Sequence, residues 1–216
     1  MMPHQLNWQE ICQMIPKRKA DAQKGDFGRL LCITGSRNMP GACLLSTQAA
    51  LRGGAGLVTV ATAPENPMRL AAAAPEAMWL PLETDEAGFL RSSDQNRKTL
   101  EKQLSRANAV LLGCGLGVTE ETRRLVHWVL EQAVCPVVLD ADGLNCAVSC
   151  IELSRRTGKD WILTPHPGEM ARLTGRSIPQ IQENRVETAT QFAAAYPVTL
   201  ALKGAGTLVA QGSRLA

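Results

Sequence analysis

Five glycine-rich or polar segments carry the residues of this sequence that could do chemistry. Glycines let backbone amides approach a ligand closely, and a lysine beside them supplies positive charge for a phosphate. Two nearby carboxylates can position Mg²⁺, and a histidine fixed between prolines can contact a ligand from a defined direction. Together these residue types indicate a site for a phosphate-bearing molecule. The segments are residues 35–42, 113–117, 140–145, 164–170 and 203–207.

The first two segments each lie between an apolar run and an expected helix. Gly35 to Ala42 would present backbone amides and a helix N-terminus to a ligand, although an ordinary strand-to-helix turn explains the same residues. Gly113 to Gly117 misses the dinucleotide fingerprint, because Val118 stands where that pattern requires its third glycine. Its three glycines still indicate close backbone approach, to a ligand or to a neighbouring strand, and we favour a ligand.

Asp140 and Asp142 directly follow a Val-Val-Leu run that is expected to be a strand. Alternation along a strand predicts that both carboxylates face one pocket. They are candidates for positioning a hydrated Mg²⁺ or for binding a hydroxyl-rich ligand, and the alternative is that Asp142 caps the following helix. The metal assignment stays open, because two oxygen ligands alone do not define a metal site.

His166 lies between two prolines at the end of another expected strand. The prolines fix the backbone on both sides, so we predict that His166 contacts a ligand and is not simply a structural histidine. Glu169 falls in the first turn of a short helix, where interaction with the helix dipole explains it as well as chemistry does. His4 and His127 have no comparable setting and are expected at the surface.

Lys203 opens a turn that also contains Gly204 and Gly206. A lysine at a strand end beside two glycines suits the edge of a nucleotide or polyphosphate site, and an ordinary hairpin with one exposed lysine is the alternative. Each of the five segments is weak evidence alone. Their shared place at strand ends is the stronger argument, because packing would have to explain all five separately.

Alternating strands and helices are needed to bring these segments together. Short apolar runs alternate with amphipathic stretches, which predicts an α/β fold with a mostly parallel sheet covered by helices on both faces. Ligands in such sheets bind at the carboxyl ends of the strands. The expected strands are 30–34, 57–62, 77–82, 109–112, 136–139, 161–164 and 198–202, and the expected helices are 42–52, 94–106, 119–133 and 177–196.

Length and composition predict a single soluble domain. The 216 residues are 45% hydrophobic, and a net charge of +3 is too small to indicate nucleic acid as a partner. No apolar run reaches about 18 residues, so we expect no membrane association and a cytoplasmic location. The seven cysteines lack the paired spacing of a zinc site and are expected to be reduced and buried. Residues 1–23 are expected to be an extension or linker and residues 24–216 the domain.

Taken in order, these motifs resemble the ADP/ATP-dependent NAD(P)H-hydrate dehydratases. The resemblance implies a ribokinase-like three-layer sandwich and a lyase that repairs a hydrated nicotinamide cofactor to NAD(P)H at the expense of ADP or ATP. Bacterial members typically convert ADP to AMP and phosphate. Phosphorylating the hydroxyl of the hydrate turns it into a good leaving group. The resemblance is carried by residues 24–28, 40–42, 49–58, 113–117, 140–145, 164–169 and 203–207.

The resemblance also implies roles for individual residues. Positions that hold the NAD(P)H hydrate correspond to Ala42, Gly115 and His166. Positions that line the adenine nucleotide correspond to Lys203, Gly204, Ala205, Gly206 and Thr207. Asp140 and Asp142 would lie near the phosphates and Mg²⁺. The family further implies a homotetramer.

Two departures from the family pattern affect these expectations. Cys114 replaces a common proline, which we expect to be a mild change in loop stiffness. Family members also continue into a Gly-Gly-x-Gly-Asp segment, whose aspartate is the proposed base, whereas the sequence ends at Ala216. We therefore expect the C-terminal helices to be missing, assign no catalytic residue within 1–216, and predict negligible turnover by this chain alone. The alternatives are an inactive nucleotide-binding remnant or another ribokinase-like small-molecule kinase, which the dehydratase-type segments 53–58 and 164–169 disfavour.

Overall fold

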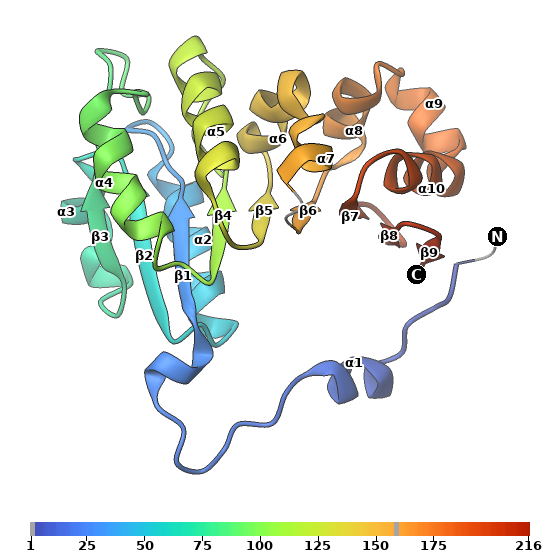
Figure 1. Cartoon of the computed structure of the whole chain (residues 1–216), viewed down its shortest axis with the longest axis horizontal. Coiled ribbons are helices and arrows are strands. Elements are labelled where there is room, and N and C mark those ends of the chain that lie inside the picture. Colours follow the sequence, from blue (N-terminus) through green and yellow to red (C-terminus); the bar gives the residue numbers. More distant parts are fainter. Residues whose placement is uncertain (1–2, 158–159) are drawn as a thin grey trace.

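The strands form one sheet whose order is β3-β2-β1-β4-β5-β6-β7-β8-β9 (Figure 1). The computed structural model describes residues 3–157 and 160–216. Strands β1 to β7 run parallel, and β8 and β9 add antiparallel strands at one edge. The bounds are β1 (Arg29–Ile33), β2 (Leu57–Thr62), β3 (Met78–Pro81), β4 (Ala109–Leu112), β5 (Val137–Leu139), β6 (Trp161–Leu163), β7 (Val198–Leu202), β8 (Leu208–Gln211) and β9 (Arg214–Leu215).

The helices that follow β1 connect the parallel strands and pack against the sheet, whereas the first helix precedes β1. The short 3-10 turns are η1 (Lys24–Phe27), η2 (Ala71–Ala73) and η3 (Val148–Cys150). The helices are α1 (Trp8–Met14), α2 (Pro40–Arg52), α3 (Asn66–Leu70), α4 (Asp94–Leu104), α5 (Glu120–Gln132), α6 (Asp142–Ala147), α7 (Leu153–Thr157), α8 (Pro167–Thr174), α9 (Ile178–Glu183) and α10 (Arg185–Ala195). This arrangement confirms the expected α/β fold with a mostly parallel sheet.

The expected strands are confirmed to within one residue at each end, and the expected helices 42–52, 94–106 and 119–133 to within two. The long helix expected over 177–196 is wrong. It is divided into α9 and α10 at Asn184, whose backbone leaves the helical region with φ −127° and ψ 43°. Asparagine favours such breaks, because its side chain competes for backbone hydrogen bonds. Here the Asn184 side chain donates to the Gln180 carbonyl over 3.5 Å.

Two hydrophobic clusters pack on opposite faces of the sheet. The larger one joins alternate residues of β1 and β4 to β8 to the apolar stripe of α5, and Trp161 lies fully buried within it. The smaller one packs α2 against β1 and β2 around Cys32, Val58 and Val60. Residues that point to the second face farther along the sheet, such as Val138 and Ile162, are only half-buried. Packing on that face is therefore densest at β1 and β2.

The N-terminal segment runs apart from the sheet and contains a helix that we did not expect. A capping box between Asn7 and Glu10 starts α1, no α1 side chain is buried, and Trp8 is 72% exposed. Figure 1 shows this segment passing below the strands, and the His4 amide donates to the Leu215 carbonyl over 3.2 Å. The segment therefore reaches the β9 edge without joining the core.

The cysteines are not all buried. Cys12 is exposed and Cys114 is half-buried, so the expectation of burial is wrong for these two. The other five are buried, and burial raises the pKa of the Cys32 thiol to about 12. His4 and His127 lie at the surface as expected. Within residues 3–157 and 160–216, we find no helix with the length and apolar character needed to cross a membrane.

Candidate functional site

The loops after β1 and β4 are joined to each other through their backbones. The Gly35 amide donates to the Cys114 carbonyl over 2.8 Å, and the Ser36 amide donates to the Gly115 carbonyl over 2.6 Å. A Cβ atom on Gly115 would lie 2.8 Å from the Cβ of Ala42. Ala42 and Gly115, both predicted to bind the hydrate, are therefore neighbours at the carboxyl ends of adjacent parallel strands.

Residues 113–117, called the glycine loop below, are packed tightly by the rest of the protein. Gly113 has φ +133°, and a Cβ atom there would lie 2.0 Å from the Asp140 carbonyl oxygen. Gly117 has φ +77°, and its Cβ would lie 2.3 Å from the ring of Phe89. Packing within the protein thus suffices to explain these two glycines.

The two aspartates after β5 point to different partners. Asp142 is the first residue of α6, and its carboxylate accepts the Gly117 amide over 2.8 Å. Asp140 instead accepts the Lys203 ammonium over 2.7 Å. The expectation that both carboxylates face one pocket is wrong, because Ala141 between them has φ 51° and ψ −121° and turns them apart. The alternative is also wrong, because Ala141 is the N-cap of α6 and makes no side-chain cap hydrogen bond.

Lys203 links the ends of β5, β6 and β7. Its ammonium lies 2.7 Å from Asp140 Oδ1 and 3.8 Å from Oε2 of Glu169, and its amide donates to the Pro165 carbonyl over 2.8 Å. Burial by itself would raise the pKa of Asp140, but the Lys203 ammonium and the Thr164 hydroxyl outweigh it and hold that pKa below its ordinary value of 3.8. Asp140 is therefore a carboxylate at neutral pH.

His166 is the N-cap of α8 and is held in a defined tautomer. Its Nδ1 accepts the Gly168 amide over 2.9 Å, and the Glu169 carboxylate accepts the His166 amide over 2.8 Å. Because Nδ1 is an acceptor, the proton of the neutral ring lies on Nε2. Nε2 lies 3.4 Å from Oε1 of Glu169, and the side chain is 54% exposed. His166 can therefore donate a hydrogen bond to a ligand.

Residues 203–207, called the lysine turn below, form the exposed connection between β7 and β8. Gly204 and Gly206 have φ +151° and +68°. Within the described part of the chain, the backbone amides of residues 204–206 have no hydrogen-bond acceptor. A lysine beside free amides can bind an anion such as a phosphate.

The predicted residues lie along one continuous edge of the sheet. Ala42 contacts Gly115, the adjacent Cys114 Sγ lies 3.7 Å from Asp140, and Asp140 binds Lys203. Glu169 then lies between Lys203 and His166. Sequence reasoning did not identify Arg185, which binds the lysine turn, or Phe89, which covers Gly117. Both residues lie far in sequence from the segments that they contact, so no local pattern indicated these contacts.

Comparisons with known proteins show which proteins this chain is similar to. A sequence model of the family described as NAD(P)H-hydrate dehydratase matches residues 30–214. A bifunctional NAD(P)H-hydrate repair enzyme Nnr of Coxiella burnetii is 38% identical over 209 residues, which are 97% of this chain and 39% of that protein. An ADP-dependent (S)-NAD(P)H-hydrate dehydratase of Bacillus subtilis is 34% identical over 197 residues, covering 91% of this chain and 65% of that protein.

A solved structure has the same fold. The ADP/ATP-dependent NAD(P)H-hydrate dehydratase of Bacillus subtilis, co-crystallised with ATP/Mg²⁺, superposes with a TM-score of 0.75 at 30% identity, covering 95% of this chain and 68% of that one. This likeness confirms the ribokinase-like architecture. The chain thus spans between about two fifths and two thirds of the length of these relatives. From the family match and the shared fold, the chain belongs to the NAD(P)H-hydrate dehydratase family.

Proposed function

We propose that this chain carries the ligand-binding edge of an ADP-dependent (S)-NAD(P)H-hydrate dehydratase, a lyase of nicotinamide nucleotide repair. The single observation that supports this most is the continuous edge that runs from Ala42 and Gly115 past His166 to Lys203, within a chain of that family. A hydrated coenzyme and a phosphate donor have to lie side by side for this reaction. The edge offers backbone surface at one end and an anion-binding turn at the other.

The proposed roles follow from the groups that each end presents. The hydrate would lie against Ala42 and Gly115, with Nε2–H of His166 donating to one of its oxygens. The lysine turn would hold the adenine nucleotide, with the Lys203 ammonium and the free amides neutralising phosphate charge. Transfer of the terminal phosphoryl group of ADP to the hydrate hydroxyl releases AMP, and loss of phosphate from the product restores NAD(P)H, with one proton released overall. Positioning and charge neutralisation supply most of the catalysis in phosphoryl transfer.

Mg²⁺ is proposed to enter with the nucleotide. Within the described residues there is no group of three His, Cys, Asp or Glu side chains that could hold a metal ion. Asp142 accepts the Gly117 amide with Oδ2 and would have its other oxygen for the ion, and Asp140 would act as an oxygen donor when Lys203 moves to a phosphate. The ion would reduce the charge of the phosphates, which supply most of its oxygen ligands.

The remaining parts of the proposal concern the extent, assembly and location of the protein. We propose a domain from residue 24 onward, supported by Lys24, whose carbonyl packs so closely on Gly56 that a Cβ atom there would lie 1.7 Å away. We also propose a homotetramer, on the family resemblance, and a cytoplasmic location. Light scattering of the purified chain tests the assembly, because a monomer or dimer would contradict it.

A binding function without turnover is the second candidate. The printed sequence contains no Gly-Gly-x-Gly-Asp segment. Asp140 accepts a hydrogen bond from Lys203, and Asp142 accepts one from the Gly117 amide. We therefore propose that residues 1–216 bind nucleotide and hydrate, and that turnover needs the aspartate of that segment.

The test combines binding with turnover. ADP and NADPH hydrate are titrated into residues 1–216 by calorimetry, and the reduced-nicotinamide absorbance is followed after the two are mixed. Saturable binding of both ligands with negligible recovery of absorbance is expected. Robust turnover would overturn the need for the aspartate, whereas binding of neither ligand would overturn the proposed function. A version extended with a Gly-Gly-x-Gly-Asp segment is expected to recover the absorbance.

A further inference from the structure

Arg185 binds three carbonyl groups around the lysine turn. Its Nη2 donates to the Gly206 carbonyl over 2.9 Å and to the Leu202 carbonyl over 3.2 Å, and its Nη1 donates to the Lys203 carbonyl over 3.4 Å. The guanidinium therefore spans the turn from the end of β7 to its far side. Arginine presents its donors in a planar fork, which suits such multiple binding better than the single ammonium of lysine.

Gly204 is shaped to admit this guanidinium. Its φ is +151°, and a Cβ atom there would lie 2.1 Å from Nη1 of Arg185. Gly206 differs, because a Cβ atom there would meet nothing within 4 Å. One glycine of the turn is thus required by the arginine and not by a ligand, whereas the other faces open space.

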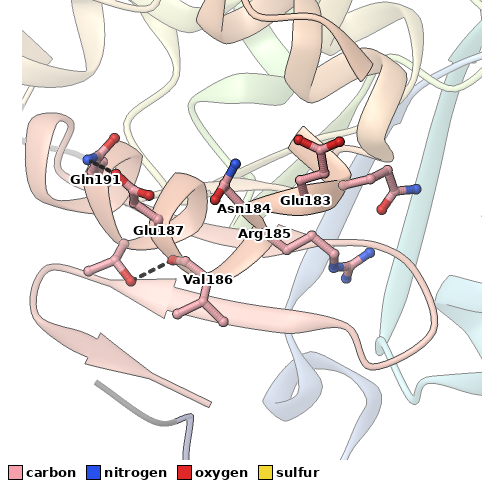
Figure 2. A pocket seen from close by; sticks show the side chains of 8 residues that line it. Glu183, Asn184, Arg185, Val186, Glu187 and Gln191 are labelled. Carbon is pink, nitrogen blue, oxygen red and sulfur yellow. Dashed lines mark hydrogen bonds between the residues drawn. The ribbon is translucent and has the colours of Figure 1, made fainter. Parts of the chain in front are cut away.

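The break between α9 and α10 gives Arg185 its position. Arg185 is the first residue of α10 and directly follows Asn184, where the chain leaves the helical conformation. A cavity of about 590 Å³ lies beside this break, and residues 182–187 are among those lining it. Figure 2 shows the Arg185 side chain extending from the start of the helix toward the loop between the two strands. A continuous helix would send residue 185 in another direction.

Because Arg185 binds the carbonyl groups of the lysine turn, the amide groups of the turn are the ones left to bind a ligand. Three carbonyls are directed to Arg185, while the amides of residues 204–206 have no acceptor within the described chain. The half-buried guanidinium also adds a second positive charge near Lys203. Both effects favour an anion on the amide side of the turn.

We propose that Arg185 is a positioning residue that holds the lysine turn in the conformation needed to bind the phosphates of an adenine nucleotide. This inference rests on the proposed function of the turn. Arg185 acts through residues 203–206 and does not itself contact the reacting atoms.

The experiment compares R185A and R185K with R155A in the 216-residue chain. Arg155 is a matched control, because its guanidinium also binds a carbonyl, that of Ala195 at the far end of α10, with distances of 2.8 and 3.1 Å. The amide resonances of Gly204 and Gly206 are recorded by NMR without ligand, and the affinities for ADP and for NADPH hydrate are measured by calorimetry.

We expect R185A to shift and broaden both glycine resonances and to weaken ADP binding about tenfold, with little change in hydrate affinity. R185K should recover only part of the ADP affinity, and R155A should leave the resonances and both affinities unchanged. A purely structural role would instead weaken both ligands together. That result, or unchanged resonances in R185A, would overturn the inference.

The outcome separates this inference from the proposed function. If the wild-type chain binds ADP and R185A binds it equally well, Arg185 has no positioning role and the proposed function stands. If the wild-type chain binds no ADP, the proposed function fails. The nucleotide role of Arg185 then fails as well, even if the glycine resonances shift in R185A.

Discussion

The glycine loop and the lysine turn lie on the same edge of the sheet, but they are held in different ways. The glycine loop is fixed mainly by contacts between backbones, through Gly113 against Asp140 and through Gly115 against the loop after β1, and the Asp142 carboxylate adds one side-chain contact at Gly117. The lysine turn is exposed and is fixed by the side chains of Arg185 and Asp140. A surface made of backbone is rigid, whereas one held by side chains can adjust to a charged ligand.

The largest effect expected from this difference concerns stability. G113A should lower the free energy of unfolding by about 3 kcal/mol or more. Gly113 has positive φ, and the new Cβ would also collide with the backbone of Asp140 and Gly143. G206A also has positive φ but open space, so it should cost only about 1 kcal/mol. Urea unfolding of both variants checks this. Equal losses would show that the two glycine-bearing segments are held alike.

The next effect concerns ligand affinity at the lysine turn. K203M should weaken ADP binding at least about tenfold, because it removes the ammonium that neutralises phosphate charge. K98M makes the same change of charge on the exposed face of α4, away from the edge, and should bind ADP normally. Calorimetric titration compares the two variants. Loss of affinity in both would mean that overall charge, and not the turn, holds the nucleotide.

A smaller effect concerns pH, through the ion pair between Asp140 and Lys203. The pKa of Asp140 is lower in the folded protein than its ordinary value of 3.8, so the pair stabilises the fold above pH 3.8 and the contribution is lost as the pH falls through the folded value. D140N removes the charge at every pH. The difference in unfolding free energy between wild type and D140N should therefore shrink below pH 3.8. Urea titrations at several pH values check this, and a difference that grew on acidification would contradict it.

The smallest effect concerns the thiol of Cys114, which lies in the glycine loop and faces Asp140. Burial raises the pKa of Cys114, its nearness to Asp140 adds to this, and Lys203 opposes it. ADP should slow thiol labelling of Cys114 a few-fold, because it covers the edge and draws Lys203 toward phosphate. Exposed Cys12 serves as the internal control and should label at the same rate with and without ADP. Mass spectrometry of labelled peptides measures both rates, and faster labelling of Cys114 would contradict the coupling.

Local patterns were sufficient to predict most of the fold. Strands such as Leu57–Thr62 are short apolar runs between turns, and the stripe of α5 repeats with helical spacing, so both signals lie within a few neighbouring residues. Contacts between distant residues gave no such signal. Asp140 and Lys203 are 63 residues apart, and nothing near Asp140 indicated that it would bind lysine while Asp142 bound Gly117.

The same limit explains the missed break in the helix over 177–196. Asparagine occurs within helices as well as at their breaks, so Asn184 by itself did not indicate where the helix would be divided. The break coincides with contacts that Arg185 makes with the turn 18 residues later. Without knowledge of the turn, the helical periodicity of this stretch favours one continuous helix.

Ala141 separates the two aspartates that contact the glycine loop and the lysine turn. Its left-handed backbone is rare for a residue with a side chain and costs about 1 to 3 kcal/mol. In return, successive carboxylates diverge, so that Asp142 secures the glycine loop and Asp140 meets the lysine turn. Both anchors of the edge therefore depend on the backbone of one strained residue.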